Sequence, residues 1–244
     1  MKKIIITGAC GSIGNEIIKY FYKEYDLICI DVDNKNLKNL KEKYKKINIY
    51  QCDLTNSKKV NQLIKKLNSK YKQFDILINN AGMIFSDPII KLGPKGFKTH
   101  SYTSWKKILD VNLNSVFLFS TKVIENFCNH RTEGIIINVS SISAKGNVGQ
   151  SAYSVAKSGI EILTKIWAKE LSTFNIRVAC IAPGFFNTKS THNSLSKFQI
   201  DHLKKNTPLK RLGHTDELIQ ALSFIINNKF FNGKVLPLDG GLEL

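Results

Sequence analysis

Short apolar runs alternate with longer amphipathic segments along almost the whole chain, and this alternation restricts the fold more than any other feature. The apolar runs have the length of β-strands, whereas the segments between them carry apolar residues at helical spacing. Strands separated by helices pair in parallel, and uninterrupted apolar strands are typical of a sheet that is covered on both faces. We therefore expect an α/β fold of the Rossmann type, with a doubly wound, mainly parallel seven-stranded sheet and helices on both faces.

The boundaries of these elements follow from the same pattern. The expected strands are Lys3–Thr7, Asp26–Asp31, Asn48–Cys52, Phe74–Asn79, Gly134–Val139, Ile176–Ala182 and Lys234–Leu238. The expected helices are Ser12–Tyr25, Lys35–Lys45, Asn56–Tyr71, Trp105–Asn129, Ser151–Thr173 and Thr215–Asn227, with a weaker helical segment over Thr191–Asn206. The segment Met83–Ser104 contains two prolines and two glycines and is expected to be an irregular, extended loop. No linker or repeat interrupts the pattern, so residues 1–244 are expected to form one domain.

The composition excludes several classes of protein. The formal net charge is +17, but only three of the 36 basic residues are arginines, which leaves 33 lysines spread along the chain. Base reading and bidentate phosphate contacts favour arginine, so we expect no nucleic-acid partner. No apolar run approaches the ~18 residues of a membrane span. The five cysteines form no CxxC pair, and we expect neither a disulfide framework nor a metal site. The chain is expected to be cytoplasmic.

A glycine-rich turn, with glycines at Gly8, Gly11 and Gly14, joins the first expected strand to the first helix. Glycine permits the tight turn and lets the backbone approach a pyrophosphate, while the helix N-terminus offers free N–H groups and partial positive charge. These features predict a site for a dinucleotide. The same spacing is also compatible with a tight strand–helix turn that binds no ligand.

The second expected strand ends on an acidic residue, Asp31, which follows Gly14 by 17 residues. A carboxylate near this position is expected to hold the adenosine ribose hydroxyls and to repel a 2′-phosphate. No arginine follows it, because the next residues are Val32 and Asp33. The pattern favours NAD over NADP, although an ordinary turn at the end of a strand would look similar.

A tyrosine and a lysine lie four residues apart in the sequence YSVAK, Tyr153 to Lys157, at the start of an expected helix. Residues at this spacing share one helix face. An ammonium group near a phenol favours the phenolate and lowers the pKa of the tyrosine. We expect Lys157 to act in this way on Tyr153, which could then exchange a proton with a carbonyl or alcohol oxygen.

Together with further motifs in the same order, these features resemble the short-chain dehydrogenase/reductase family, in its single-domain branch. The resemblance extends over essentially the whole chain. The matching stretches are TGACGSIG at Thr7–Gly14, CDLT around Asp53, NNAG at Asn79–Gly82, DVNL around Asn112, NVSS at Asn138–Ser141, YSVAK, APG at Ala182–Gly184 with Thr188, and LDGG at Leu238–Gly241.

The resemblance implies a role for each matching residue. Tyr153 would be the general acid/base, Lys157 would also bind the nicotinamide ribose, Ser141 would polarise the substrate oxygen, and Asn112 would support a proton relay. Cofactor contacts are expected from Gly8, Gly11, Ser12, Ile13, Gly14, Asp31, Asp53, Leu54, Asn80, Ala81, Gly82, Tyr153, Lys157, Pro183, Gly184, Phe186 and Thr188.

Three departures from the family pattern bear on the site. Ser12 stands where a glycine is more usual in the single-domain branch. In the family, the catalytic serine usually precedes the catalytic tyrosine by 13 residues, and counting back from Tyr153 points to Ser140. The position within the strand motif NVSS points instead to Ser141. We favour Ser141. The loop around 83–104, with Lys95, Lys98 and His100, is longer than usual and is expected to shape the substrate pocket or to be a surface excursion.

The functional expectation is an NAD(H)-dependent enzyme that interconverts a secondary alcohol and a ketone. Alternatives are a 3-oxoacyl-thioester reductase or 3-hydroxyacyl dehydrogenase, a sugar or polyol dehydrogenase, and a non-catalytic dinucleotide sensor or nucleic-acid-binding protein. The resemblance also implies a substrate loop around 188–208. It further implies a homo-oligomer, a dimer or tetramer, built on the two long helices.

Overall fold

A seven-stranded sheet forms the centre of the computed structural model, which describes residues 1–94 and 96–244. The strand order is β3-β2-β1-β4-β7-β8-β9, and every neighbouring pair is parallel. These strands are β1 (Lys3–Thr7), β2 (Asp26–Asp31), β3 (Asn48–Gln51), β4 (Ile76–Asn79), β7 (Ile135–Val139), β8 (Arg177–Pro183) and β9 (Val235–Leu238). The order reverses between β1 and β4, and the crevice outside the carboxyl ends at such a point is where open α/β sheets bind ligands.

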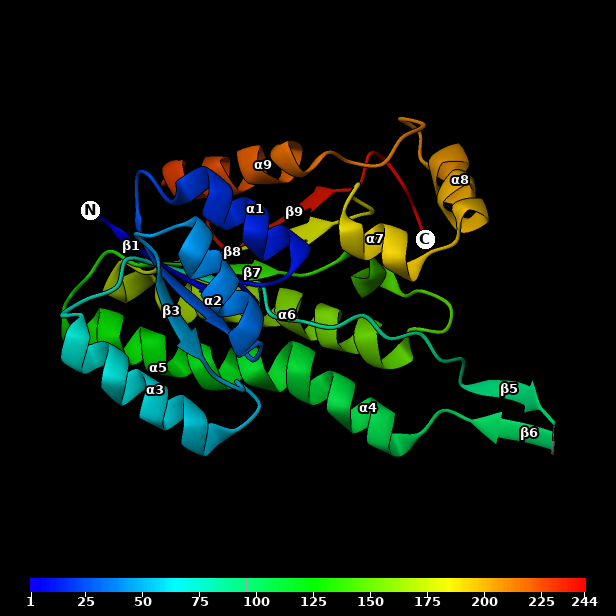
Figure 1. Ribbon diagram of the computed structural model, residues 1–244, viewed down its shortest axis with the longest axis horizontal. Helices are drawn as coiled ribbons and strands as arrows, with labels where there is room; N and C mark the ends of the chain where they lie inside the picture. The colour runs from blue at the N-terminus through cyan, green and yellow to red at the C-terminus, as the bar shows by residue number, and fades with distance from the viewer. Residues whose placement is uncertain (95) are drawn as a thin grey trace.

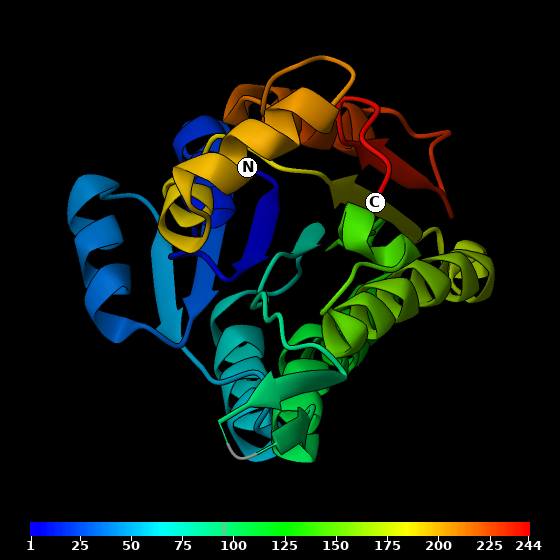
Figure 2. The same cartoon turned by 90° about the vertical axis from the view of Figure 1, so that its right-hand side faces the viewer.

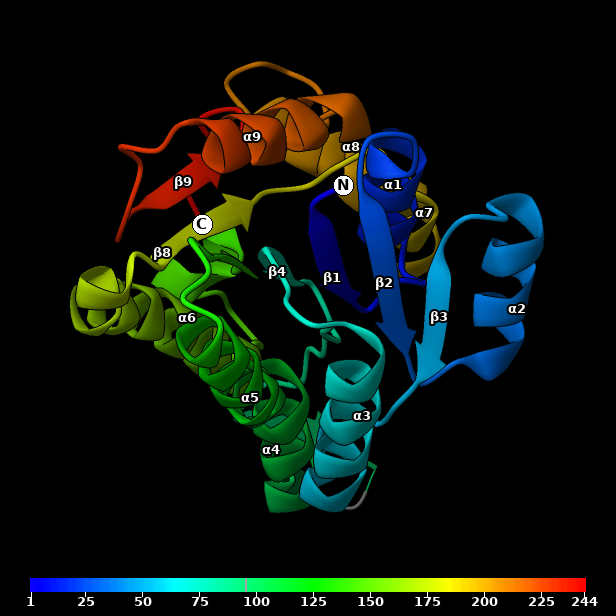
Figure 3. The ribbon, with the colours of Figure 1, turned by 90° about the vertical axis from the view of Figure 1, so that its left-hand side faces the viewer.

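Helices cover both faces of the sheet, so the predicted fold is confirmed (Figures 1 and 3). One face packs against α1 (Ser12–Phe21), α2 (Asn34–Lys43) and α9 (Thr215–Asn227), and the other against α3 (Ser57–Lys70), α5 (Ser115–Asn129) and α6 (Ser151–Glu170). The isoleucines of β1 divide between the two cores, because successive side chains of a strand point to opposite faces. Within the described residues, no helix is long and apolar enough to cross a membrane.

The expected helix Trp105–Asn129 is interrupted, contrary to the prediction. It consists of α4 (Tyr102–Leu109), a π-helical turn η1 (Asp110–Asn114) and α5. Asn112 lies in this turn, and its side-chain amide donates to the Ile108 carbonyl at 3.0 Å. A π-turn inserts one residue into the helical ladder and re-aims the side chains around it, and such turns are frequent at functional sites. Helical periodicity alone does not distinguish a π-turn from a continuous helix.

The expectation of an irregular segment over Met83–Ser104 is wrong. The segment contains a hairpin of two antiparallel strands, β5 (Ile90–Gly93) and β6 (Gly96–Thr99), and α4 begins at Tyr102 within it. The prolines and glycines flank the strands or end them, and the strands themselves carry β-branched Ile90 and Thr99 and aromatic Phe97 among other residues. Lys95 lies outside the described residues.

Several boundaries also differ from those predicted. Helix α1 ends at Phe21 rather than Tyr25, and α6 ends at Glu170 before a short 3-10 turn, η3 (Ser172–Phe174). The following Asn175 has a left-handed backbone conformation, with φ of 57°, which turns the chain toward β8. The remaining elements are a 3-10 turn η2 (Ile142–Lys145) and two helices over the predicted substrate loop, α7 (Lys189–Ser194) and α8 (Lys197–Asn206).

Candidate functional site

Tyr153 and Lys157 lie one turn apart in the first half of α6, and both side chains are buried. The Lys157 ammonium nitrogen lies 5.6 Å from the centre of the Tyr153 ring and donates to the Val139 carbonyl at the end of β7, at 2.8 Å. The site therefore joins the N-terminal half of α6 to the carboxyl edge of the sheet, and Tyr153 and Lys157 share one helix face, as their spacing predicted.

The electrostatics differ from the expectation that Lys157 lowers the pKa of Tyr153. Burial raises the pKa of the Tyr153 phenol above its usual value, and a hydrogen bond from the Ser141 side chain opposes this increase. Burial also lowers the pKa of Lys157 to about 8. Loss of water outweighs charge stabilisation because the ammonium group lies over the ring and binds a carbonyl rather than the phenol oxygen.

The two candidate serines have different surroundings. Ser140 is buried, and its hydroxyl lies within hydrogen-bonding distance of two acceptors on α6, the Lys157 carbonyl at 3.1 Å and the Glu161 carboxylate at 3.0 Å, so it links β7 to α6. Ser141 is partly exposed and begins the turn η2, where its hydroxyl accepts from the Ser143 N–H at 3.2 Å, and its side chain lowers the pKa of Tyr153. The side chain of Ser141 therefore lies on the Tyr153 side, whereas the hydroxyl of Ser140 points into the interface between β7 and α6.

Asn112 is fully buried and is held by the backbone after β4. Its side-chain oxygen accepts from the Met83 N–H at 3.1 Å, and its amide nitrogen donates to the Met83 carbonyl at 3.0 Å. Gly82 lies between Asn112 and Lys157: a β-carbon there would stand 2.7 Å from the Asn112 oxygen and 3.5 Å from the Lys157 nitrogen. The absence of a side chain at Gly82 thus allows Asn112 and Lys157 to approach each other.

The glycine-rich turn fits a dinucleotide phosphate group. Gly8 has φ of +64°, and a β-carbon there would stand 2.7 Å from the Ala81 backbone. A β-carbon on Gly14 would stand 2.4 Å from the Gly8 carbonyl oxygen, so α1 can begin this close to the turn only with glycine. Gly11 precedes α1 and is exposed, which leaves the helix N-terminus open to an anion. Ser12 and Ile13, both partly buried, form the first turn of α1.

Two acidic residues lie at the carboxyl ends of β2 and β3. The Asp31 carboxylate accepts from the Cys10 N–H at 2.9 Å and from the Asp33 N–H at 3.0 Å, which places it directly beside the glycine-rich turn. Asp53 accepts from the Thr55 hydroxyl at 2.7 Å, and this hydrogen bond holds the pKa of Asp53 below its usual value. The neighbouring Leu54 is buried. The structure thus aligns Asp31 and Asp53 along the edge expected to hold adenosine.

The end of β8 supplies the other side of the crevice. Pro183 is the last residue of β8, and a β-carbon on Gly184 would stand 2.8 Å from the Asp239 α-carbon, so the chain passes close to the segment after β9. Phe186 is buried, and Thr188 caps α7 by accepting from the Thr191 N–H at 3.2 Å. Pro183 to Thr188 therefore connects the sheet edge to the helices over the predicted substrate loop.

One residue that joins the phosphate turn to β4 was not singled out from the sequence. The buried hydroxyl of Thr7 accepts from the N–H groups of Asn80 and Ala81, at 3.1 and 3.0 Å. The Asn80 side chain in turn donates to the carbonyls of Thr7 and Gly8, at 3.1 and 3.0 Å. The available signal was a polar residue at the end of an otherwise apolar strand, directly before the glycine turn.

An apolar wall around Tyr153 was missed as well. Tyr153 forms a small cluster with Ile108 and Ala152, against which Met83, Phe85 and Trp105 pack. The last three come from the segment that was expected to be irregular and from α4. Their sequence spacing shows no periodicity that would have brought them to one place.

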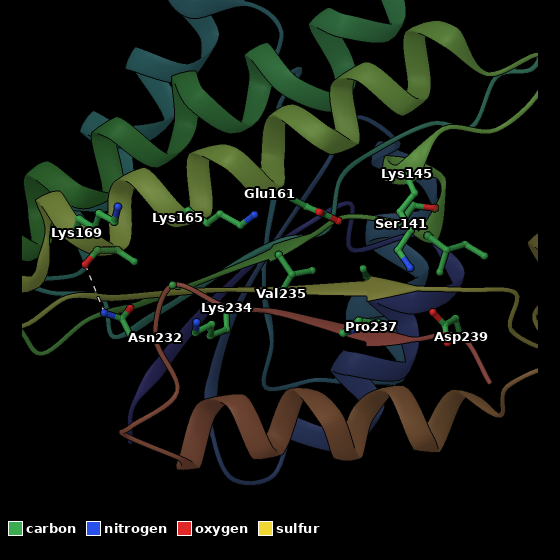
Figure 4. Close-up of a pocket in the computed structure, with 14 residues that line it drawn as sticks. Ser141, Lys145, Glu161, Lys165, Lys169, Asn232, Lys234, Val235, Pro237 and Asp239 are labelled. Atoms are coloured by element: carbon green, nitrogen blue, oxygen red, sulfur yellow. Dashed lines mark hydrogen bonds between the residues drawn. The ribbon is translucent and has the colours of Figure 1, made fainter. Parts of the chain in front are cut away.

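A cavity of about 640 Å³ opens between α6 and β9, with Ser141 at one end (Figure 4). Lys165 and Lys169 of α6 face it from one side and Lys234 and Val235 from the other. Tyr153 and Lys157 do not line it, so Ser141 stands at the boundary between this cavity and Tyr153. In residues 1–94 and 96–244, no group of three or more His, Cys, Asp or Glu side chains is placed to hold a metal ion.

Comparison with known proteins agrees with this architecture. Residues 2–198 match the family model described as short chain dehydrogenase. The chain is 32% identical to the 3-oxoacyl-(acyl-carrier-protein) reductase FabG of Thermotoga maritima, over 100% of this chain and 98% of the relative. It is 36% identical to the protein of the same name from Buchnera aphidicola, with the same coverage. Among solved structures, 4-hydroxyisoleucine dehydrogenase complexed with NADH is similar with a TM-score of 0.90, at 31% identity, covering 99% of this chain and 98% of that one.

The resemblance predicted from the motifs is therefore confirmed. The family model alone covers most of the chain, and the relatives extend the similarity to its full length. The chain belongs to the short-chain dehydrogenase family, whose members are oxidoreductases that act on CH–OH and C=O groups with a nicotinamide dinucleotide.

Proposed function

We propose that this protein is an NAD(H)-dependent reductase of 3-oxoacyl thioesters in which Tyr153 is the general acid. The observation that carries the substrate class is the similarity, over the full chain, to reductases of 3-oxoacyl groups on acyl-carrier protein. This reverses the order of the expectations from sequence, which placed a simple secondary alcohol or ketone first. The choice of NAD(H) rests on Asp31, whose carboxylate lies beside the phosphate turn.

In this proposal, the hydroxyls of Ser141 and Tyr153 converge on the substrate carbonyl oxygen. Ser141 polarises the oxygen, and Tyr153 gives it a proton. Burial raises the pKa of Tyr153, so the phenol carries its proton at neutral pH, as a proton donor must. A bound nicotinamide dinucleotide would supply the hydride, held through the turn Gly8–Gly14 and Asp31.

Lys157 and Asn112 would carry protons between Tyr153 and solvent. Lys157 has a pKa of about 8, so its ammonium group can give up and regain a proton near neutral pH. Asn112 is aligned by three hydrogen bonds to backbone groups and lies across Gly82 from Lys157. The two residues would form the start of a relay from Tyr153 toward solvent.

Residues 1–244 would act as one domain, with the segment around 188–208 covering bound substrate through α7 and α8. Exclusion of water from the crevice would protect the hydride step. The active form would be a homo-oligomer. Phe117 on α5 and Ile166 on α6 remain exposed in the single chain and are candidates for helix-mediated contacts, whereas Val116 and Trp167 pack into its core.

Oxidation of a hydroxylated amino or carboxylic acid is the second candidate. It is favoured by the similarity to 4-hydroxyisoleucine dehydrogenase, at 31% identity and a TM-score of 0.90. The two candidates differ in the substrate and in the direction of hydride transfer, but they assign the same roles to Ser141 and Tyr153.

The test is a comparison of substrates and cofactors with the purified protein. The absorbance of reduced nicotinamide would be followed with 3-oxoacyl thioesters, 4-hydroxy amino acids, polyols and simple ketones, each with both dinucleotides. We expect the highest kcat/KM for a 3-oxoacyl thioester with NADH. A higher value for the hydroxy acid would move the assignment to the second candidate, and a preference for NADPH would refute the role of Asp31.

Replacing Tyr153 tests the chemical step. Tyr153→Phe removes the proton donor and should lower kcat at least ~100-fold while NADH affinity stays within a few-fold. Tyr71→Phe is the matched control, because it removes another buried phenol, which contacts Tyr50 at 3.2 Å. Substantial turnover in Tyr153→Phe would exclude Tyr153 as the acid.

A further inference from the structure

His100 lies at the base of the hairpin β5–β6, between the end of β6 and the start of α4. The hairpin projects beyond the end of α4, and its base lies beside the N-terminal end of α6 (Figures 1 and 2). The His100 N–H donates to the Ile89 carbonyl at 3.0 Å, and the Asp87 N–H donates to the Gly149 carbonyl at 2.6 Å. These hydrogen bonds close the hairpin and attach it to the loop that precedes Tyr153, so His100 has a fixed position near α6.

The two ring nitrogens of His100 have different surroundings. Nδ1 lies 3.0 Å from the Asp87 carbonyl oxygen, which can only accept, so Nδ1 carries the hydrogen of the neutral imidazole and Nε2 is a hydrogen-bond acceptor. Only 5% of the side chain is exposed, and within residues 1–94 and 96–244 no group pairs with the buried Nε2. A buried acceptor without a partner is destabilising, so a donor from outside the chain would stabilise this arrangement.

The Phe85 ring lies between His100 and the apolar wall around Tyr153. It is nearly perpendicular to the imidazole ring, with 5.9 Å between the ring centres and 79° between the ring planes. The same ring packs against the small cluster formed by Ile108, Ala152 and Tyr153. Phe85 is only partly buried and lies outside the helices and strands, so its side-chain rotation is less restricted than that of a core residue.

We propose that His100 is a specificity-determining residue, whose Nε2 accepts a hydrogen bond from an N–H group of the substrate once the Phe85 ring turns aside. The inference rests on the proposed function, in which Ser141 and Tyr153 hold the reacting oxygen, and it adds a second point of attachment. The Asp87 carboxylate lies 3.8 Å from Nδ1, so the surroundings of the imidazole favour a donor and disfavour an anionic group.

The same N–H chemistry occurs in both candidate substrates. An acyl thioester on a cysteamine arm has an amide N–H two carbons beyond its sulfur, and a 4-hydroxy amino acid has an ammonium group. Simple ketones and polyols have no N–H group. The experiment therefore uses pairs of ligands that differ in this group alone.

The test measures steady-state kinetics with a 3-oxoacyl thioester of N-acetylcysteamine and with its analogue in which an ester oxygen replaces the amide N–H. His100→Asn keeps a nitrogen at the position of Nδ1, which can still donate to the Asp87 carbonyl, but it lacks Nε2. His100→Gln keeps a polar atom at the reach of Nε2. His130→Asn is the matched control, because Nδ1 of His130 also lies 3.0 Å from a backbone carbonyl, that of Asn126.

In the wild type, we expect kcat/KM for the amide-containing thioester to exceed that for the ester analogue by ~10-fold, mainly through a lower KM. His100→Asn should reduce this ratio to about 1, His100→Gln should restore part of it, and His130→Asn should keep the wild-type ratio. The same series with a 4-hydroxy amino acid and its deaminated analogue shows which substrate class supplies the N–H group. Equal ratios in His100→Asn and the wild type for both ligand pairs would overturn the proposal, and a water molecule as the partner of Nε2 would give that result.

A spectroscopic measurement separates this proposal from the proposed function. The protein is prepared with isotope-labelled histidine, and the Nε2 resonance of His100 is assigned among the five histidines with the His100→Gln variant. With the dinucleotide bound, the amide-containing thioester should shift this resonance and the ester analogue should not. A selective shift without turnover would refute the proposed function and support the role of His100. If neither ligand pair shifts the resonance selectively, the role of His100 is refuted, whether or not the protein turns the ligands over.

Discussion

The substitution Gly82→Ala probes the geometry between Asn112 and Lys157 with the smallest possible change. A β-carbon at Gly82 would stand 2.7 Å from the Asn112 side-chain oxygen. Ordinary contacts begin near 3.4 Å, so Asn112 would have to move by about 0.7 Å. Asn112 is fully buried and makes three hydrogen bonds of 3.0 to 3.1 Å, so it has no free direction in which to move.

The cost can be worked out from these hydrogen bonds. Loss of the two bonds with the Met83 backbone at ~0.5–1.5 kcal/mol each, together with a penalty of ~1–3 kcal/mol for a buried polar group left unpaired, gives about 2–6 kcal/mol. For a chain of this size, 1 kcal/mol corresponds to ~2–4 °C in Tm, so we expect a decrease of about 4–24 °C. Turnover should fall at least ~10-fold, because misplacement by a fraction of an ångström disturbs a preorganised site.

Thermal unfolding by circular dichroism and steady-state kinetics measure the two effects. Gly93→Ala is the matched control, because its new β-carbon would stand no closer than 3.3 Å to any atom, that atom belongs to the flexible Lys98 side chain, and the Gly96 carbonyl lies at an ordinary 3.4 Å. In an Asn112→Ala background the clash is absent, so adding Gly82→Ala should cost less than about 1 kcal/mol. An unchanged Tm in Gly82→Ala, or an equal penalty in both backgrounds, would refute the argument.

Three further predictions concern charge. Asp31→Asn should raise the preference for NADPH relative to NADH by ~10–100-fold in kcat/KM, because it removes a negative charge near the expected 2′-phosphate position, whereas Asp33→Asn should have a smaller effect. Burial lowers the pKa of Lys157 to about 8, below its value in the unfolded chain. The charged ammonium group therefore destabilises the wild-type fold at pH 7, and this destabilisation disappears as the pH rises from 8 to 10. Lys157→Met carries no such charge, so urea titrations should show its advantage in unfolding free energy over the wild type decreasing between pH 8 and 10. Arg177→Ala should lower the unfolding free energy by about 3 kcal/mol, because the guanidinium donates to two carbonyls in the last turn of α9 and to the Phe231 carbonyl beyond it. Arg211→Ala should cost under about 1 kcal/mol, because Arg211 is exposed and its partner Glu217 is partly exposed.

The sheet and the position of the site could be predicted because they depend on local patterns. Apolar runs give the strands, and the carboxyl ends of parallel strands lie at one edge of the sheet, so Gly8, Asp31 and Ser141 all lie along that edge although they come from distant parts of the chain. The hairpin could not be predicted in this way, because the prolines and glycines that flank it are equally common in loops. The π-turn at Asn112 could not be recognised from the sequence either, because one inserted residue hardly alters the spacing of apolar residues along a helix.

The pKa of Tyr153 shows a different limit of sequence reasoning. The spacing of Tyr153 and Lys157 predicted that they share a face, and they do. The predicted direction of the pKa shift was wrong, because burial and the hydrogen bond of Lys157 to the Val139 carbonyl depend on packing between α6 and β7. A motif specifies which groups meet, whereas the tertiary environment decides which protonation state is favoured.

A row of buried side chains explains why α6 holds its position against the sheet. Asn79 of β4 donates to Asn138 of β7 at 2.9 Å, and Asn138 donates to the Thr164 hydroxyl of α6 at 2.9 Å. Thr164 completes the row by donating to the Ile160 carbonyl at 2.8 Å. Each group is buried, so an unpaired member would be costly and the register of α6 against β7 is restricted. Tyr153 and Lys157 lie on the same helix as Thr164. The buried hydrogen bonds of Asn79, Asn138 and Thr164 therefore also determine how far Tyr153 and Lys157 lie from the edge of the sheet.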